Sequence, residues 1–492
     1  MSKKGQRQRR RLQEQAPPSG QKPSRNLAAR DMDAMAEELV TYHTLFHDLF
    51  ARREQREWSA FYLRGQLSNL ERKSVEPMVL ALKGPEVAAV RAGQQFLGEG
   101  AWEDTPILTR HHRLVGESLG EPDGIVIFDG SGFPKQGTHS VGVAPQYCGA
   151  LGKIANCQQG VFAAYVSRKG YTFLDRRLYM PQEWFDEGHA PLRQRYGVPR
   201  ELGFQTEPQL ALEMLRGVVK GGVVPFKWVV ADEHYGMIPA FLDGVAAVGK
   251  WYFAEVPVST KVWEGTPQLE PPGPGPMGRP RKHPRVVAGA SKAEEVRQLA
   301  ARLPARAWRR YPIKEGSKGP IEAAFAFARA TRARRGRPGP SVWVVFRRSL
   351  AEKHTVKCFL SNAPASCPHT ELVRVSGLRW PVETAIEEAK GELGMDHYET
   401  RTWRGWHHHM TQTFLAHHFL VRMRLHLKKS PGADARPGST AVGDCAAAPS
   451  IERTRGPRDR ALSPRAQLCR LLLPSQADPE TTPTARTPTA KT

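Results

Sequence analysis

The stretch Gly124-Ile-Val-Ile-Phe-Asp129 is a short apolar run that ends in an acid, and Phe226-Lys-Trp-Val-Val-Ala-Asp232 repeats this pattern further along the chain. Apolar runs of this length, bounded by turn residues, are typical of buried strands. Between them, residues 157–166 and 171–180 are rich in β-forming residues and are separated by a short turn that contains glycine, which predicts a hairpin. Residues 208–221 have helical periodicity, so the sequence predicts an α/β fold.

A third acid lies in a later segment, Arg379-Trp-Pro-Val-Glu383-Thr-Ala-Ile-Glu-Glu-Ala-Lys390, which reads as a helix with proline in its first turn. Helical spacing places Glu383 and Lys390 on one face, just after Arg379, and apolar residues on the opposite face. Carboxylates held on rigid elements are the ligands that hard divalent cations need, and paired cations of this kind catalyse phosphoryl transfer. A surface helix laced with ion pairs would carry the same charges, so the helix alone does not decide between the two.

The overall charge indicates an anionic partner. The chain of 492 residues has 72 Lys and Arg against 49 Asp and Glu, a net charge of +23. Such an excess attracts polyanions, with nucleic acid as the first candidate and an anionic membrane surface as the second. No apolar run is long enough to span a membrane, which weakens the second. The six cysteines have no metal-binding spacing and predict reduced thiols in a cytoplasmic protein. A basic but otherwise ordinary soluble protein is the alternative.

Composition also predicts how the chain is divided. A helical segment carries basic residues among its apolar ones and is a candidate binder of DNA ends; these are Arg52, Arg53, Arg56, Arg64, Arg72 and Lys73. The expected parts are a disordered basic arm (1–30), this helical domain (31–118), the first part of the α/β core (119–263), a basic, partly Pro/Gly-rich insertion (264–340), the second part of the core with the glutamate helix (341–429) and a largely disordered tail (430–492).

Three weaker features have two interpretations each. Residues 278–280 and 335–338 are similar to the Arg-Pro core of minor-groove hooks, although a basic flexible loop would look the same. The histidines at 407–409 and 417–418 could indicate a metal, but on an amphipathic helix they favour packing and polarity facing DNA. Trp380, Trp403 and Trp406 could stack on a flipped base, whereas core packing is the preferred interpretation.

The spacing from Arg379 through Glu383 to Lys390 is the core of the YREK signature, and the chain resembles the DDE transposases of the insertion sequence 701 branch of the insertion sequence 4 clan. The resemblance covers roughly residues 35–425. Its supporting motifs are Phe128-Asp-Gly-Ser-Gly-Phe-Pro-Lys-Gln-Gly137, His139-Ser-Val-Gly-Val143, Gln146-Tyr-Cys-Gly149, Leu151-Gly-Lys-Ile-Ala-Asn156, Ala231-Asp-Glu-His-Tyr-Gly236, Lys314-Glu-Gly-Ser-Lys-Gly-Pro320, Gly391-Glu-Leu-Gly-Met-Asp-His-Tyr398 and Arg404-Gly-Trp-His-His-His-Met410.

This resemblance implies a ribonuclease H-like catalytic core, with an N-terminal helical domain and an insertion between the second Asp and the Glu. It implies that Asp129, Asp232 and Glu383 are catalytic residues that bind two Mg²⁺ ions, for which Mn²⁺ would substitute. The expected phosphate contacts are Arg379, Lys390 and Lys135. The implied partner is double-stranded DNA, as terminal inverted repeats and as target, bound by a homo-oligomer of the chain in the bacterial cytoplasm at the nucleoid, with no membrane partner.

The implied reaction cuts the element end to leave a 3′-OH, which then attacks target DNA without a covalent protein intermediate. Two residues depart from the family pattern. Ser376 stands where the signature has tyrosine, and Gly130 replaces a second acid, which leaves Asp129 as the ligand candidate there. The alternatives are a ribonuclease H-like nuclease or resolvase that cuts without joining, and a decayed, non-catalytic DNA-binding copy.

We predict that the affinity for duplex DNA falls steeply as salt rises, because Lys and Arg contacts to phosphates release condensed counterions. Binding to element ends should require residues 31–118. Titration of labelled duplex at low and at physiological salt tests this. A dissociation constant that is the same at both concentrations would contradict it.

Overall fold

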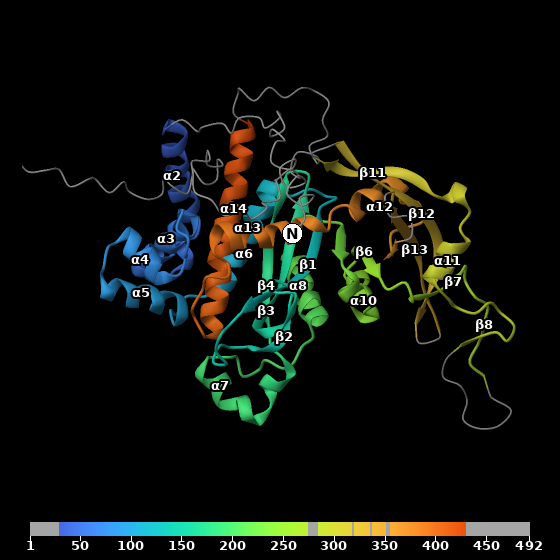
Figure 1. Ribbon diagram of the computed structural model, residues 1–492, viewed down its shortest axis with the longest axis horizontal. Coiled ribbons are helices and arrows are strands. Elements are labelled where there is room, and N and C mark those ends of the chain that lie inside the picture. The colour runs from blue at the N-terminus through green and yellow to red at the C-terminus, as the bar shows by residue number, and fades with distance from the viewer. Residues whose placement is uncertain (1–28, 274–283, 317–318, 335–336, 351–354, 430–492) are drawn as a thin grey trace, which may run out of the picture.

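The computed structural model describes residues 29–273, 284–316, 319–334, 337–350 and 355–429 (Figure 1). Residues 1–28, the tail from 430 and the first hook-like motif (278–280) therefore lie outside the described residues, as do residues 335–336 of the second.

The helices are α2 (Ala29–Thr44), α3 (Arg53–Leu67), α4 (Val75–Leu82), α5 (Val87–Gly98), α6 (Asp104–Leu119), α7 (Ala190–Arg195), α8 (Glu207–Gly221), α9 (Glu233–Gly236), α10 (Pro239–Ala247), α11 (Val296–Arg302), α12 (His369–Ser376), α13 (Trp380–Leu393) and α14 (Trp403–Lys429). The strands are β1 (Ile125–Pro134), β2 (Ala144–Cys148), β3 (Lys153–Ser167), β4 (Gly170–Tyr179), β5 (Trp228–Ala231), β6 (Trp251–Val256), β7 (Lys261–Glu264), β8 (Leu269–Glu270), β9 (Arg285–Val286), β10 (Glu294–Glu295), β11 (Arg309–Gly316), β12 (Gly319–Arg334), β13 (Arg337–Ser349) and β14 (Val356–Ser361).

The centre of the molecule is a five-strand unit in the order β4-β3-β1-β5-β6. Strands β1, β3 and β4 pair antiparallel in succession, whereas β5 joins β1 in parallel and β6 joins β5 in parallel. A three-strand meander followed by two parallel strands is the order of a ribonuclease H-like core. The expected α/β class with that core and an N-terminal helical region is confirmed.

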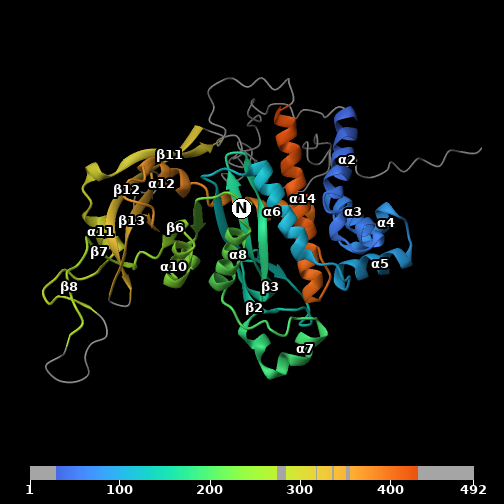
Figure 2. The same cartoon turned by 180° about the vertical axis from the view of Figure 1, so that it is seen from behind.

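Alternation along the strands assigns the two faces of this sheet. Ile125, Ile127 and Phe162 belong to one hydrophobic cluster, which also contains the buried side of α13 and the start of α14. Val126 and Phe128 point the opposite way, into a cluster that α8 and α10 cover. Figure 2 shows α8 and α10 from behind, and Figure 1 shows α13 and α14 in front of the strands.

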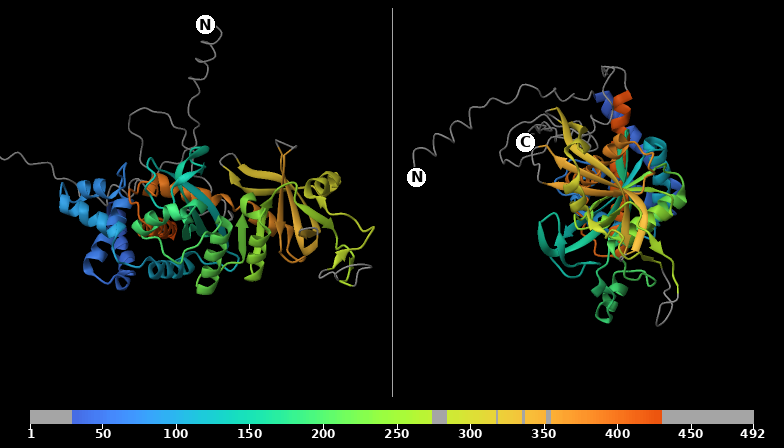
Figure 3. Two further views of the ribbon diagram at one scale, coloured as in Figure 1. Left: turned by 90° about the horizontal axis from the view of Figure 1, so that it is seen from below. Right: turned by 90° about the vertical axis from the view of Figure 1, so that its right-hand side faces the viewer.

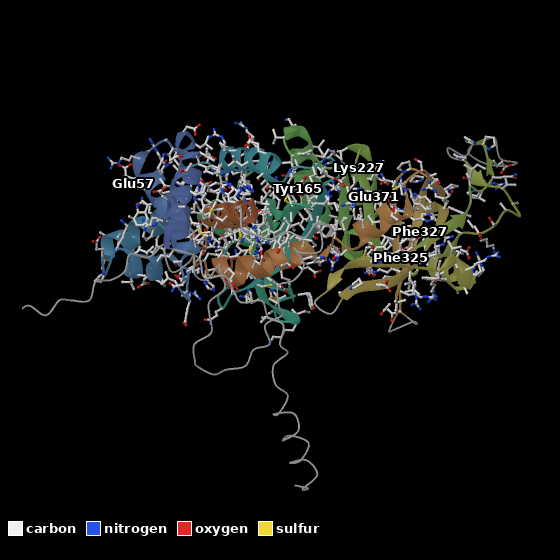
Figure 4. All side chains as sticks on the ribbon, turned by 90° about the horizontal axis from the view of Figure 1, so that it is seen from above. Glu57, Tyr165, Lys227, Phe325, Phe327 and Glu371 are labelled. Atoms are coloured by element: carbon white, nitrogen blue, oxygen red, sulfur yellow. The ribbon has the colours of Figure 1, made fainter. Side chains whose placement is uncertain are left out.

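The sheet extends well beyond this central unit. In the described residues it contains twelve strands, and from β6 it continues through β14, β13, β12, β7 and β10. The segment expected as an insertion (264–340) therefore contributes β10, β11, β12 and the start of β13 to the same sheet, whereas its β8 and β9 form a separate two-stranded sheet. The strand β12 lacks a clear signal in the sequence because alanines, which have modest β-propensity, alternate with Phe325 and Phe327 and are followed by arginines. Figure 4 shows Phe325 and Phe327 of β12 far from Glu57 of α3, at the other end of an elongated molecule.

Helix α14 joins the N-terminal helices to the sheet (Figures 1 and 3). Trp406, Met410 and Phe414 pack into the sheet cluster, whereas Leu415 and Phe419 pack with the N-terminal helices. A helix apolar on nearly all sides is buried on nearly all sides. This explains why α14 shows weaker amphipathic patterning than its length would suggest.

Histidines on α14 satisfy buried polar groups on both sides of it. Tyr62 Oη donates to His409 Nδ1 (2.8 Å), and His409 Nε2 donates to Met395 O (3.0 Å). His418 Nδ1 is 3.1 Å from Tyr42 Oη, and its Nε2 is 2.9 Å from Ser118 Oγ. All of these side chains except Ser118 are buried. The histidines therefore bind the N-terminal helices to the core, which confirms the packing interpretation and corrects the expectation that they face DNA.

One of the expected basic residues does not face solvent. The Lys73 side chain is buried, and its Nζ donates to the carbonyl oxygens of Gln66 (2.8 Å) and Glu392. Lys73 thus neutralises the carbonyl end of α13 and holds it against α3. Arg52 and Arg64 are exposed, so the basic surface of this region comes from the arginines.

We predict that the protein loses stability as the pH falls below about 6.5. Burial lowers the pKa of His111 and of His409 from 6.5 to about 3. The unfolded chain therefore takes up protons first, so the stabilisation is complete above pH 6.5 and is lost as the pH falls toward 3. Each histidine should contribute about 1.4 kcal/mol of loss per pH unit in this window.

Urea denaturation at neutral and at mildly acidic pH measures this loss. His139, which is exposed, provides a control: His139→Gln should leave the pH dependence unchanged. A midpoint that stays constant as the solution is acidified would show that the buried histidines do not govern stability.

Candidate active site

The register of β1 and β5 sets Asp129 beside Asp232. Ile127 lies opposite Val230, so continuing the register by two residues brings the two aspartates level. Asp232 follows β5 directly and is the N-cap of α9, where its Oδ1 accepts a hydrogen bond from Tyr235 N (3.3 Å). Asp129 does not end its strand as expected, because β1 continues to Pro134 in pairing with β3. The site therefore lies beside a strand that continues past it.

Glu383 approaches these aspartates from α13. The helix buries Val382, Ala389 and Leu393 against the core, as the sequence pattern predicts, and this leaves Glu383 exposed. Arg379 precedes the helix, and its guanidinium forms an ion pair with Glu383. The same guanidinium lies 3.8 Å from Asp232 Oδ2. One arginine thus connects the helix acid to a strand acid.

The electrostatics of Asp129 reflect the same convergence. Burial raises the pKa of Asp129 to about 7, against the opposing effect of Arg379. The negative charges of Asp232 and Glu383 raise it further. The three acids predicted from the sequence therefore lie near one another, and a cation beside Asp129 would favour its ionised form.

The chemistry of this donor set fits a hard divalent cation, because oxygen atoms come from two strands and a helix. As positioned, no three His, Cys, Asp or Glu side chains in the described part of the chain gather closely enough to share one ion. Arg379 explains the spacing, since it pairs with both Asp232 and Glu383. If Arg379 moved away, the carboxylate oxygens of Asp232 and Glu383 would be free to bind a cation.

Glu207 is a fourth carboxylate that the sequence reasoning missed. It is the first residue of α8, whose start is fixed by a capping box in which Thr206 N donates to Gln209 Oε1 (2.8 Å). A Cβ added to Gly130 would lie 2.7 Å from Gln159 Nε2 and 3.4 Å from Glu207 Oε2. Gly130 therefore leaves space that Glu207 borders, on the face of the sheet that α8 covers, whereas Asp129 points to the opposite face.

Glu207 lies beside His234, which follows Asp232 by two residues in the chain. His234 Nε2 is 3.5 Å from Glu207 Oε2, and this hydrogen bond is the main cause of a raised pKa for His234. Tyr235 is buried, its hydroxyl has no hydrogen-bond partner among the described residues, and burial together with the charge of Glu207 raises its pKa. No sequence signal indicated Glu207, because only the tertiary structure brings the start of α8 beside β1.

The two lysines expected to contact phosphate line the part of β1 beyond Asp129. Lys390 Nζ donates to Gly132 O (2.9 Å) and lies 4.7 Å from the centre of the Phe133 ring. Lys135 Nζ lies 3.5 Å from the centre of the Tyr398 ring. Both are partly buried, and burial lowers the pKa of Lys135 to about 8.

Ser376 stands where the family resemblance led us to expect a tyrosine. Its hydroxyl is buried and donates to Val373 O (2.7 Å) within α12. Arg347 of β13 donates to Ser376 O (3.1 Å). Burial lowers the pKa of Arg347, and the positive charge of Arg379 lowers it further. Arg347 thus brings a cation near the start of α13 that the sequence reasoning did not single out.

Two further expectations concern neighbouring side chains. Trp406 is fully buried, and Trp403 packs against the sheet cluster, so core packing is the correct interpretation for both. Trp380 lies 6.4 Å from Tyr171, ring centre to ring centre. No helix in the described residues is long and apolar enough to cross a membrane.

Comparison with known proteins identifies a family. A model of the DDE superfamily endonuclease family matches residues 45–320, a range that includes Asp129 and Asp232 but ends before Glu383. No curated protein matches the chain. Among solved structures, a piggyBac transposase synaptic complex with hairpin DNA, determined by cryo-EM, is 9% identical, with 82% of this chain and 80% of that chain covered and a TM-score of 0.33. Such a score is too low to establish a shared fold, so the fold rests on the strand order.

We predict opposite outcomes for two adjacent glutamates of α13. Glu388 accepts a hydrogen bond from Tyr171 Oη (3.0 Å) and lies 3.4 Å from His417 Nε2, so it is not a solvated surface charge. Glu388→Ala should lower the free energy of unfolding by about 1–3 kcal/mol, because its partners would lose a buried acceptor. Glu387→Ala should change it by less than about 0.5 kcal/mol, since Glu387 is exposed. Denaturant titration compares them, and equal effects would refute the assignment.

Proposed function

The chain belongs to the DDE superfamily endonucleases, and on that basis we propose that it is a DNA transposase, which cuts the ends of a mobile element and joins them to target DNA. The observation that carries the proposal is the gathering of Asp129, Asp232 and Glu383 around Arg379. The net charge of +23 supports DNA as the partner.

In this proposal Asp129, Asp232 and Glu383 hold two Mg²⁺ ions, and Mn²⁺ substitutes for them. When bound, the ions supply charge stabilisation at the attacking and leaving oxygens of the phosphodiester. The carboxylates themselves come from β1, the end of β5 and α13, elements fixed by the sheet and its core. Their positions therefore cost little reorganisation when DNA binds, which is the main protein contribution to phosphoryl transfer.

Cations around the acids position the phosphates. Arg379 neutralises Asp232 and Glu383 in the free protein, and we expect it to turn toward a phosphate when DNA and metal bind. A guanidinium suits this role because it presents two parallel donors to a phosphate. Lys390 and Lys135 extend the positive charge along β1, and Arg347 adds a cation at the start of α13.

The reaction would proceed in two steps at one site. First, water attacks the phosphodiester at the element end, and the bond to the 3′ oxygen breaks to leave a 3′-OH. Second, that 3′-OH attacks a target phosphodiester, so one phosphorus–oxygen bond forms as another breaks. A nuclease or resolvase would perform the first step alone. A homo-oligomer that holds two element ends together would allow both ends to join the same target.

We predict that Asp129→Ala, Asp232→Ala and Glu383→Ala each reduce strand cleavage at least about a thousandfold while DNA binding survives. The expected loss is several kcal/mol of transition-state stabilisation, because each variant removes a metal ligand. Binding rests mainly on Lys and Arg contacts, so it should persist. The assay uses labelled DNA that carries the inverted repeats flanking the gene, with Mg²⁺. Ca²⁺ should support binding but not cleavage.

Glu387→Ala is the matched control, because it changes an exposed acid on the same helix and should leave cleavage intact. Products joined to target DNA support a transposase, whereas cut ends without joined products indicate the nuclease. If all three variants keep full cleavage activity, the proposed site is wrong. If the intact chain binds DNA but never cuts it, the chain is a non-catalytic DNA-binding protein.

A further inference from the structure

The hairpin formed by β2 and β3 exposes apolar side chains at its tip. Tyr147 and Ile154 lie directly opposite each other in the two strands. Their exposed fractions are 66% and 72%, and Ile154 is the most exposed large hydrophobic residue among those described. Leu151 in the connecting turn is 47% exposed. Exposed apolar side chains clustered in this way indicate a binding surface rather than ordinary surface composition.

The hairpin is firmly attached to the core. Asn156 Nδ2 donates to the carbonyl oxygens of Lys135 (2.8 Å) and Gly137 (2.9 Å), and Gln146 Nε2 donates to Cys157 O (2.8 Å). Cys148, the last residue of β2, is buried. The tip therefore projects from a fixed base, and Figure 3 shows the teal hairpin standing out from the body in its right-hand view. A rigid projection can present side chains to a partner without an ordering cost.

The sheet places this tip relative to the acids. Phe162 lies opposite Asp129, and Ile154 precedes Phe162 by an even number of residues on the same strand, so both face the side of the sheet that α13 covers. Eight residues of β3 span about 26 Å at the usual rise per residue. The tip lies beyond Pro134 at the end of β1, because Pro134 pairs with Cys157 and Ile154 precedes Cys157 on β3.

The charges that the segment from β1 to β4 contributes favour a polyanion, although Asp396 lies near Lys135 and Lys390. No Asp or Glu occurs between Asp129 and Asp175 in the sequence. Lys390 and Lys135 lie along β1 beyond Asp129, and Lys153 at the start of β3 is exposed next to Ile154. A duplex that follows these lysines from the acidic site would reach the apolar tip. A second copy of this chain would gain nothing from the lysines, since its own surface is also basic.

We propose that the tip of the β2–β3 hairpin is a DNA wedge, in which Tyr147 and Ile154 insert against a base step of the duplex roughly 8 base pairs from the cleaved phosphate. Apolar side chains at the end of a basic arm unstack base steps and bend the duplex in this manner. The inference rests on the proposed function for the identity of the ligand. It adds a contact that anchors the flanking duplex while its end lies in the site.

The test replaces Tyr147 with a photo-crosslinking phenylalanine analogue in the full chain, with a labelled linear duplex as the probe. We expect crosslinks to DNA, centred roughly 8 base pairs from the cut position. In parallel, the double variant Tyr147→Ser with Ile154→Ser should weaken duplex binding about tenfold, comparable to the loss of one aromatic–base stack. 2-Aminopurine placed at the crosslinked step should brighten with the intact chain and not with the double variant.

Val258→Ser provides the control, because Val258 is also exposed (43%) and follows β6, which β5, β1 and β3 separate from β2 in the sheet. It should bind DNA as the intact chain does. Crosslinks to a second copy of the chain, or a double variant that binds DNA normally, would overturn the wedge. The proposed function can fail separately: if the intact chain crosslinks to DNA through position 147 but does not cut it, the wedge stands and the transposase proposal falls.

Discussion

The parallel pairing of β1 with β5 is the constraint on which the rest of the site depends. It sets Asp129 level with Asp232 by register, before any side chain of the site makes a contact. Strands that pair in parallel need a long connection, and here that connection contains β3, β4 and α8. The same crossover brings Glu207 beside Gly130, the residue after Asp129. A shift in register by one residue would turn every side chain of β1 to the opposite face, so Asp129 would no longer lie near Asp232 and Glu383.

A second constraint comes from α14, which is buried between the sheet and the N-terminal helices. Its polar groups are satisfied through neutral histidines, each of which can donate from one ring nitrogen and accept at the other. His409 uses this property to join Tyr62 of α3 to the backbone after α13. The helix that carries Glu383 is thus supported by the N-terminal helices. Changes in those helices can therefore affect the position of the acid without touching it.

The site is rich in acids, although the chain as a whole is strongly basic. Asp129, Asp232 and Glu383 lie near one another, and Arg379 pairs with two of them. Such a cluster is costly unless a cation is shared, so Arg379 stabilises the acids in the free protein. The lysines that continue along β1 then lead away from the acids toward the hairpin. Lysines therefore flank the acids on the side of β1 that leads to the hairpin.

The sequence by itself determined the elements that carry the acids, because strands and helices are set by local periodicity. The buried face of α13 and the strand character around Asp129 and Asp232 follow from the apolar spacing alone. Only the tertiary structure decided which charged side chains are exposed to solvent and which are buried among partners. It buries Lys73 and Glu388 among partners distant in sequence, brings Glu207 to Gly130, and joins the alanine-rich strand β12 to the central sheet. These outcomes depend on contacts between remote segments, for which local patterns carry no information.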